Sequence, residues 1–438
     1  MRDGSLWRAL LGVEKTVIEG VEFDPDSTLG PMVVVAVRAW SRSRRRCGVC
    51  RGRSPAYDLG QGRRRWRGLD LGTVQVFLEA DAPRVRCREH GVVVAHVPWA
   101  RHGAGHTRAF DDQIAWLAVR SSKTTVSALM RVAWRTVGSI ITRVADEAIV
   151  GRDQLAGLKR IGIDEISYKR GHKYLTVVVD HDTRRLVWAA PGRDRDTLRG
   201  FFDSLGPERA AQITHVSADA ADWVAQVVAE RCPDAVQCAD PFHVVAWATE
   251  ALDEIRRETW NTARKQAAAT RRSGPGHRRA HGSLDRYRGI ARSRYALWKN
   301  PENLTENQHA KIAWIAKTEP RLHRAYLLKE GLRHVFVFKG TAGIEALDRW
   351  CSWARRSRIP AFLKLAQRIA RHREKIIATL EHGLSNALIE STNTKIRLLT
   401  RMAFGFHGPE PLVALAMLAH GGYCPPLPGR QPTHGSVR

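Results

Sequence analysis

The spacing of apolar residues changes along the chain, and each change predicts a different kind of element. Residues 6–18 carry apolar positions at helical spacing, so we expect a short helix and a linker over residues 1–30. Residues 31–106 alternate short β-branched runs with turns, which predicts a small β-rich module. Residues 107–150 return to helical spacing. The N-terminal part is therefore expected to hold a β module followed by helices.

Beyond residue 150 the pattern becomes that of an α/β layer. Apolar runs of strand length alternate with amphipathic segments, which predicts strands at 161–163, 174–179, 186–190, 213–216 and 235–238 and helices at 195–204 and 221–230. Residues 241–383 are almost wholly helical, with a break rich in Gly, Pro and Arg at 271–282. Residues 425–438 are rich in Pro and Gly and are expected to be disordered.

Two short motifs lie within the β-rich module. Cys47 and Cys50 form one pair, and Cys87 and His90 form a second pair of the same spacing. Each pair offers two zinc ligands from one tight turn, and four such ligands complete a closed structural site. The alternative is four unrelated residues in a loop-rich module. A filled site would present nearby arginines to DNA: Arg44, Arg45, Arg46, Arg64, Arg65 and Arg67.

The helical segment that follows has the features of a DNA-binding helix-turn-helix. We expect helices at 124–130 and 134–147, the second with a buried apolar stripe. Arg131 occupies the turn position where Gly is usual, and a plain helical hairpin would show the same stripe. The face opposite the stripe carries side chains that suit phosphates and base edges, namely Arg135, Thr136, Ser139 and Arg143.

Three acidic residues stand out in this basic chain. Asp164 and Asp219 each follow an apolar strand, and Glu390 lies on an amphipathic helical segment. Acids just past strand ends line the functional edge of an α/β sheet, and carboxylates are the ligands that Mg²⁺ prefers. Together they could hold two divalent ions about 3.5–4 Å apart for chemistry on a phosphate backbone. The alternative is that each aspartate forms a turn or caps a helix.

The segment around Glu390 adds polar and basic groups. Asn393 and Arg397 follow Glu390 at helical spacing, so the three side chains share a face. Arg397 could clamp a phosphate there, or merely pair with a surface carboxylate. We therefore treat Asn393, Lys395 and Arg397 as candidate DNA contacts.

The overall charge favours a polyanionic partner, and we expect double-stranded DNA. The chain has 71 Lys and Arg against 44 Asp and Glu, a formal net charge of +27. It opens on no signal-peptide pattern, and no apolar run approaches the roughly 18–20 residues of a membrane helix. The seven cysteines fit reduced thiols in the cytoplasm, so clustered cysteines predict a metal before a disulfide.

With these motifs the chain resembles the DDE transposases of bacterial insertion sequences, most closely the ISL-three family. The resemblance covers roughly residues 40–424 and implies an RNase H-like α/β core in two parts, 151–249 and 384–424, separated by an all-helical insertion at 250–383. It would make Asp164, Asp219 and Glu390 the ligands of Mg²⁺ or Mn²⁺. It rests on the Cys/His motif, on residues 162–165 (GIDE), on residues 240–245 (DPFHVV) and on the Glu390 helix continuing to residues 401–406 (RMAFGF).

The same resemblance implies an enzyme that cuts DNA at the element's terminal inverted repeats and joins the freed 3′-hydroxyl to target DNA. Such an enzyme is expected to act as a homo-oligomer on DNA at the bacterial nucleoid. Asp240 and His243 match a D-x-x-H motif of related transposases, so His243 is a candidate DNA contact; the alternative is a structural histidine at the start of a helix. Asp219 lacks the usual sequence context, which leaves Asp222 and Asp240 as other candidates for the second ligand, although the predicted strand end favours Asp219. A DNA-binding regulator on the same scaffold, and a nuclease without a joining step, are the alternatives.

Overall fold

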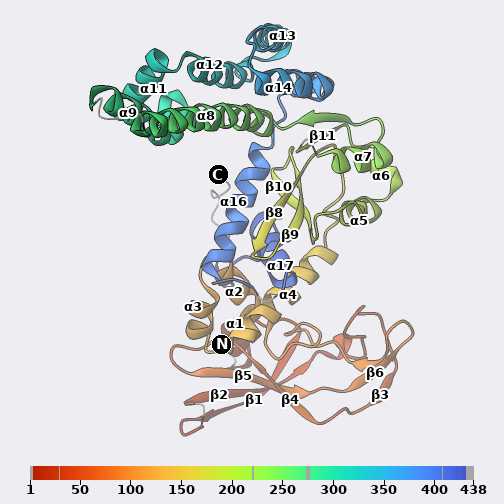
Figure 1. Cartoon of the computed structure of the whole chain (residues 1–438). Helices are drawn as coiled ribbons and strands as arrows, with labels where there is room; N and C mark the ends of the chain where they lie inside the picture. The colour runs from red at the N-terminus through yellow and green to blue at the C-terminus, as the bar shows by residue number, and fades with distance from the viewer. Residues whose placement is uncertain (1–2, 29, 220, 273–276, 407, 431–438) are drawn as a thin grey trace. The chain divides into compact units, whose positions relative to one another are not determined.

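The computed structural model describes residues 3–28, 30–219, 221–272, 277–406 and 408–430. The fold divides into two compact units, one of residues 1–154 and 396–438 and one of residues 155–395 (Figure 1). The break expected at 271–282 and the tail expected at 425–438 fall partly on residues 273–276 and 431–438, which lie outside the described residues.

A four-stranded sheet organises the first unit. Its order is β1-β2-β5-β4, and only the central pair, β2 and β5, is parallel. The inward faces of these strands bury Val35 and Leu78, and Trp66 meets Trp99 edge to face with 5.5 Å between ring centroids. The bounds are α1 (Asp3–Leu11), β1 (Thr16–Asp24), β2 (Met32–Ala39), β4 (Arg63–Arg67) and β5 (Gln75–Asp81).

The first strand corrects one expectation. The helix expected at 6–18 ends at Leu11, and much of the expected linker forms β1. Thr16, Val17 and Ile18 are β-branched and pair with β2, so tertiary pairing outweighs the helical spacing of the apolar residues. A smaller sheet of order β3-β6-β7 follows the turn η1 (Ser41–Ser43) and comprises β3 (Ala56–Asp58), β6 (Arg84–Cys87) and β7 (Gly91–Val94).

Four helices complete the first unit. They are α2 (Arg108–Ala118), α3 (Lys123–Met130), α4 (Trp134–Val150) and α17 (Glu410–His420), and α4 packs against the other three. The side chains of Thr107 and Ser122 cap α2 and α3 by accepting backbone N–H groups. Arg131 adopts the left-handed conformation, with φ of 53°, that a glycine usually supplies between α3 and α4.

A five-stranded mixed sheet, β10-β9-β8-β11-β12, organises the second unit. The first three strands are antiparallel, and β11 and β12 run parallel to β8. Helices α5 and α7 bury Phe201 and Val227 in the sheet's core. The bounds are β8 (Arg160–Lys169), β9 (Lys173–Asp180), β10 (Arg185–Pro191), α5 (Arg195–Leu205), α6 (Pro207–Ala210), β11 (His215–Ala218), α7 (Asp222–Arg231) and β12 (Val236–Ala239).

The remainder of the second unit is helical, and helices α8 to α15 pack around a core of their own (Figure 1). Helix α16 belongs to the second unit up to Lys395 and to the first unit from Ile396. Leu252, Leu328 and Phe362 are fully buried there. None of the helices in the described part of the chain combines the length and apolar character of a membrane-spanning segment. The bounds are α8 (Pro241–Arg272), α9 (His277–Arg292), α10 (Arg294–Trp298), η2 (Pro301–Asn303), α11 (Glu306–Thr318), α12 (Pro320–Val335), α13 (Gly340–Arg356), α14 (Pro360–Arg371), α15 (Arg373–His382) and α16 (Ala387–Met402).

Candidate functional site

Three aspartates occupy equivalent positions on adjacent strands of the second unit. Ala218 of β11 pairs with one residue on each neighbouring strand, Ile163 of β8 and Ala239 of β12. Each of these residues is followed by an aspartate: Asp164, Asp219 and Asp240. Because neighbouring strands lie about 4.8 Å apart, the register sets the three carboxylates in one row.

The row corrects the expected place of Asp164. The strand predicted at 161–163 continues to Lys169 in antiparallel pairing with β9, so Asp164 lies inside β8. Asp219 and Asp240 do follow the ends of their strands, β11 and β12. The continuation was not apparent in the sequence because polar residues interrupt the apolar run after residue 163.

Helix α16 packs closely on this part of the sheet. A Cβ atom on Gly162 would lie 2.3 Å from Cδ1 of Ile389, so the absence of a side chain at 162 allows the helix to approach β8. One turn along the helix, the Asn393 side chain donates a hydrogen bond to Oδ2 of Asp164 over 2.7 Å. Glu390 lies between these two contacts in the sequence and is half-buried.

Negative charge accumulates around the row. Burial, followed by the charges of Asp240 and Asp164, raises the pKa of Glu390. Burial also raises the pKa of Asp164, and Asp219 and Asp240 raise it further. The pKa of Glu165 is raised to about 7, first by burial. The carboxylates therefore lie close enough for each negative charge to disfavour ionisation of the others.

His243 lies between two of the aspartates. Its Nδ1 donates to Oδ2 of Asp240 over 2.8 Å, and its Nε2 is 3.6 Å from Oδ2 of Asp219. The hydrogen bond with Asp240, together with the charges of nearby carboxylates, raises the pKa of His243 to about 9. The imidazole is therefore a cation at neutral pH.

The acidic residues differ in exposure. Asp240 is 2% exposed, Asp164, Asp219 and Glu390 are half-buried, and Asp222 is exposed at the start of α7. The ligand oxygens of Asp164, Asp219 and Glu390 do not all lie within 4.8 Å of one another. Within the described residues, potential metal ligands lie this close together only in one group of cysteine and histidine side chains.

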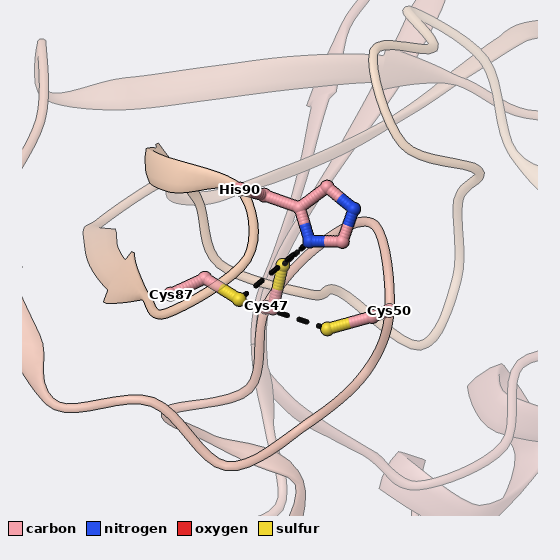
Figure 2. Close-up of side chains that lie close together, drawn as sticks. All are labelled: Cys47, Cys50, Cys87 and His90. Atoms are coloured by element: carbon pink, nitrogen blue, oxygen red, sulfur yellow. Dashed lines mark hydrogen bonds between the residues drawn. The ribbon is translucent and has the colours of Figure 1, made fainter.

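That group consists of Cys47, Cys50, Cys87 and His90 (Figure 2). Nδ1 of His90 lies 3.8 Å from Sγ of Cys47 and 3.6 Å from Sγ of Cys87, and the Sγ atoms of Cys50 and Cys87 are 3.7 Å apart. A tetrahedral zinc ion with bonds of about 2.0–2.3 Å places its ligand atoms about 3.5–3.8 Å from one another. The four side chains therefore fit zinc, as the sequence predicted.

The surroundings of these ligands fit a structural site. The pKa of Cys87 is lowered to about 6, first by its hydrogen bond with His90, which favours the thiolate that binds metal. The backbone N–H of Val49 donates to Sγ of Cys47. One nearby arginine departs from expectation: Arg67 is 6% exposed and pairs with Asp70, so it does not belong to an exposed basic surface.

The expected DNA-facing side chains of α4 divide into two groups. Arg135 and Ser139 are exposed, and Thr136 is half-buried. Arg143 is half-buried and donates to Oδ2 of the fully buried Asp111 over 3.2 Å, so its guanidinium already has a partner within the first unit. On α16, Lys395 and Arg397 are both exposed, and Arg397 belongs to the first unit.

Two residues that hold these sites together by hydrogen bonds were not predicted from the sequence. Glu147, near the end of α4, accepts hydrogen bonds from Arg51 of the first zinc knuckle and from Arg101 and Arg108, at 2.6–3.0 Å. No local sequence pattern predicts these bonds, because the partners of Glu147 come from separate segments of the chain. Asn386 precedes α16, and its backbone N–H donates to Oδ1 of Asp240 over 3.3 Å. The sequence feature that could have identified Asn386 is an asparagine directly before a predicted helix.

Comparison with protein families assigns a description to three segments of the chain. Residues 161–415 match a family of DDE transposases described as "Transposase". Residues 95–145 match the "Helix-turn-helix domain of transposase family ISL3". Residues 43–90 match the "zinc-finger of transposase IS204/IS1001/IS1096/IS1165". The predictions of a zinc-ribbon module and of a helix-turn-helix domain are thereby confirmed.

Curated relatives point the same way. The chain is 64% identical over 436 residues to the transposase for insertion sequence element IS1557 of Mycobacterium tuberculosis (strain CDC 1551 / Oshkosh), and the match covers 98% of each chain. The corresponding protein of strain ATCC 25618 / H37Rv matches equally. The chain is also 27% identical over 350 residues to the transposase for IS1001 of Bordetella parapertussis, across 79% of this chain and 82% of the relative.

Proposed function

The chain belongs to the ISL3 family of transposases, and on that basis we propose that Asp164, Asp219 and Glu390 hold divalent metal ions in an RNase H-like core. Membership makes the chain a DNA-processing enzyme of the DDE type that also carries a zinc ribbon and a helix-turn-helix. In the proposed reaction it cuts at the ends of its insertion element and joins the freed 3′-hydroxyl to target DNA.

The observation that carries the proposal is the register of β8, β11 and β12. It sets Asp164 and Asp219 side by side, and α16 packs on the same strand through Gly162 and brings Glu390 near them. The donor set is entirely hard carboxylate oxygen, which fits Mg²⁺ or Mn²⁺. Bound there, such ions would stabilise the charge on the attacking and leaving oxygens of an in-line displacement.

Other side chains have defined tasks in this scheme. Asn393 holds one oxygen of Asp164 by a hydrogen bond and so fixes the direction of the carboxylate. His243, as a cation, offers its positive charge to a phosphate of the cleaved strand. Lys395 and Arg397 are exposed and extend the positive charge along α16 for the DNA backbone.

Recognition of the terminal inverted repeats is assigned to the first unit. Arg135, Thr136 and Ser139 lie at the start of α4, where a recognition helix contacts base edges. Arg143 would contribute less directly, because it is bound to Asp111. An element has two ends, so we propose that at least two copies act together, which sedimentation of the protein with inverted-repeat DNA would test. The net charge supports residence on the bacterial nucleoid.

Substitution Asp164→Asn tests the proposal directly. With Mg²⁺ and a duplex that carries the element's inverted repeat, we expect cleavage to fall about 10³-fold or more while DNA affinity stays within about twofold. Asp234→Asn is the matched control, because Asp234 is an exposed acid between α7 and β12 and is not a candidate ligand. Wild-type cleavage by Asp164→Asn would refute the assignment. A separate assay for joined products distinguishes a transposase from a nuclease.

A further inference from the structure

We propose that Asp240 is a positioning residue that connects two helices of the site, and that it is not a metal ligand. The inference rests on the proposed function, since it concerns how the carboxylate of Glu390 reaches its place. It would also remove Asp240 from the three candidates for the second ligand, which are Asp219, Asp222 and Asp240.

Both carboxylate oxygens of Asp240 are engaged with the protein. Oδ2 accepts from Nδ1 of His243 over 2.8 Å. Oδ1 accepts from the backbone N–H groups of Phe242 and Asn386, each over 3.3 Å. With 2% of the residue exposed, the oxygens face these donors rather than a space that an ion and its water ligands could occupy.

The contact with Asn386 reaches the helix that carries Glu390. Asn386 immediately precedes α16, and its carbonyl oxygen accepts the backbone N–H of Glu390 over 2.8 Å. Asp240 therefore holds Asn386, the residue whose carbonyl oxygen accepts the first-turn N–H of Glu390. A displacement of Asn386 would move the backbone of Glu390 with it.

A neighbouring bond strengthens this connection. The hydroxyl of Thr379, on α15, donates to the carbonyl oxygen of Ala239 over 2.7 Å. Ala239 and Asp240 are consecutive, so the end of β12 is bound twice to the segment that leads into α16. These two bonds join residues 140 and 146 positions apart in the sequence, and they fix a late part of the chain to the sheet.

The contact with His243 acts on the other helix. His243 lies on the first turn of α8, and the bond from its Nδ1 to Asp240 leaves Nε2 directed at Asp219. Asp240 thus orients the imidazole ring as well as the start of α16. Asp219 is half-buried and follows the same register, which suits it to contact an ion directly.

Metal binding separates a positioning residue from a ligand. Free Mn²⁺ would be measured by electron paramagnetic resonance while full-length protein on inverted-repeat duplex is titrated with the ion. We expect Asp219→Asn to weaken Mn²⁺ binding by about tenfold or more, and Asp240→Asn to leave it within about threefold of wild type. At saturating Mn²⁺, Asp240→Asn should still slow cleavage about 10–100-fold. Equal loss of Mn²⁺ affinity in the two variants would overturn the proposal.

Hydrogen exchange tests whether Asp240 holds the start of α16 through Asn386. In Asp240→Ala, the backbone amides of residues 386–390 should exchange about tenfold faster than in wild type, because Asn386 loses its acceptor. Asp219→Ala keeps the acceptor of the Asn386 N–H, which is Asp240, so exchange of these amides should stay unchanged. Unchanged exchange in folded Asp240→Ala would refute the proposal, and if this variant does not fold, the Mn²⁺ comparison with Asp240→Asn decides alone.

The outcomes separate this proposal from the proposed function. If Asp164→Asn and Asp219→Asn both bind Mn²⁺ and cleave as wild type does, the metal site itself is wrongly assigned. If those variants fail while Asp240→Asn also loses Mn²⁺ affinity, the function stands and Asp240 is a ligand.

Discussion

At the scale of single residues, Gly162 determines how closely α16 packs on β8. An added Cβ atom would lie 2.3 and 2.8 Å from carbons of Ile389 and 2.9 Å from Nε2 of His181. These separations are shorter than any relaxed contact, and Ile389 adjoins Glu390. The distance between α16, which carries Glu390, and its sheet therefore depends on one missing methyl group.

Substitution Gly162→Ala should push α16 away from β8. We expect it to lower the free energy of unfolding by about 1–3 kcal/mol, as overpacking does, and to slow cleavage while DNA affinity is kept. Chemical denaturation and a cleavage assay measure the two effects. Gly200→Ala is the control, because no atom lies within 4 Å of its added Cβ and alanine favours the helix. Equal behaviour of the two variants would contradict this account of the packing.

Glu147 provides a residue-scale prediction that depends on pH. Burial alone would raise the pKa of Glu147, but the hydrogen bonds and charges of Arg108 and Arg101 lower it to about 2. A lowered pKa stabilises the fold above the unfolded value near 4.5, and this contribution is lost as the pH falls through about 2.

Replacement Glu147→Gln should therefore lower stability at pH 7 by about 1–2 kcal/mol, a range reduced for the partial exposure of this carboxylate. The difference from wild type should shrink between about pH 4.5 and 2, as thermal unfolding across that range would measure. Glu22→Gln, on an exposed position of β1, serves as the control. A difference independent of pH would mean that the carboxylate charge is not responsible.

At the scale of elements, the zinc ligands bracket part of the larger sheet. Strands β4 and β5 lie between Cys50 and Cys87 in the sequence, so the ion closes a loop that contains both strands. Closing such a loop restricts the unfolded chain and so stabilises the fold. The metal should therefore support the four-stranded sheet as well as the knuckles.

Joint substitution Cys47→Ser and Cys50→Ser should lower bound zinc from about one ion per chain to near zero. It should also lower the melting temperature and weaken binding to the inverted repeat. Elemental analysis and calorimetry measure these changes. Cys424→Ser is the control, because Cys424 lies outside the cluster. Unchanged zinc content in the double variant would rule the site out.

At the scale of the whole molecule, the net charge of +27 predicts a strong dependence of DNA binding on salt. If 6–10 phosphates are contacted, affinity should fall about 10³–10⁵-fold between 50 and 200 mM salt, because each contact releases counterions. Arg135→Ala should reduce the slope by about one if that side chain meets a phosphate. Fluorescence anisotropy at several salt concentrations measures both, and a flat response would exclude a surface that follows the phosphate backbone.

Local sequence patterns were sufficient to predict a structural feature when a single segment of the chain forms all of it. The spacing of Cys47 and Cys50 predicted a zinc knuckle, and the stripe on residues 134–147 predicted α4 to within a few residues. They were insufficient where distant segments decide. β1 forms because β2 pairs with it, and the place of Asp164 within β8 depends on pairing with β9. The hydrogen bonds of Asp240 and Glu147 likewise join residues that no short pattern relates.

The first unit combines the beginning and the end of the chain, so it is complete only when synthesis is complete. Residues 396–438 belong to it, and α17 packs against α4, the helix assigned to reading DNA. Glu390 precedes this segment by only a few positions. A chain released early by the ribosome, within residues 250–383, would lack Glu390, the proposed metal ligand, and α17, which packs against the proposed recognition helix. On the proposed function, such an unfinished chain could neither cut DNA nor compete well with complete copies for the element's ends.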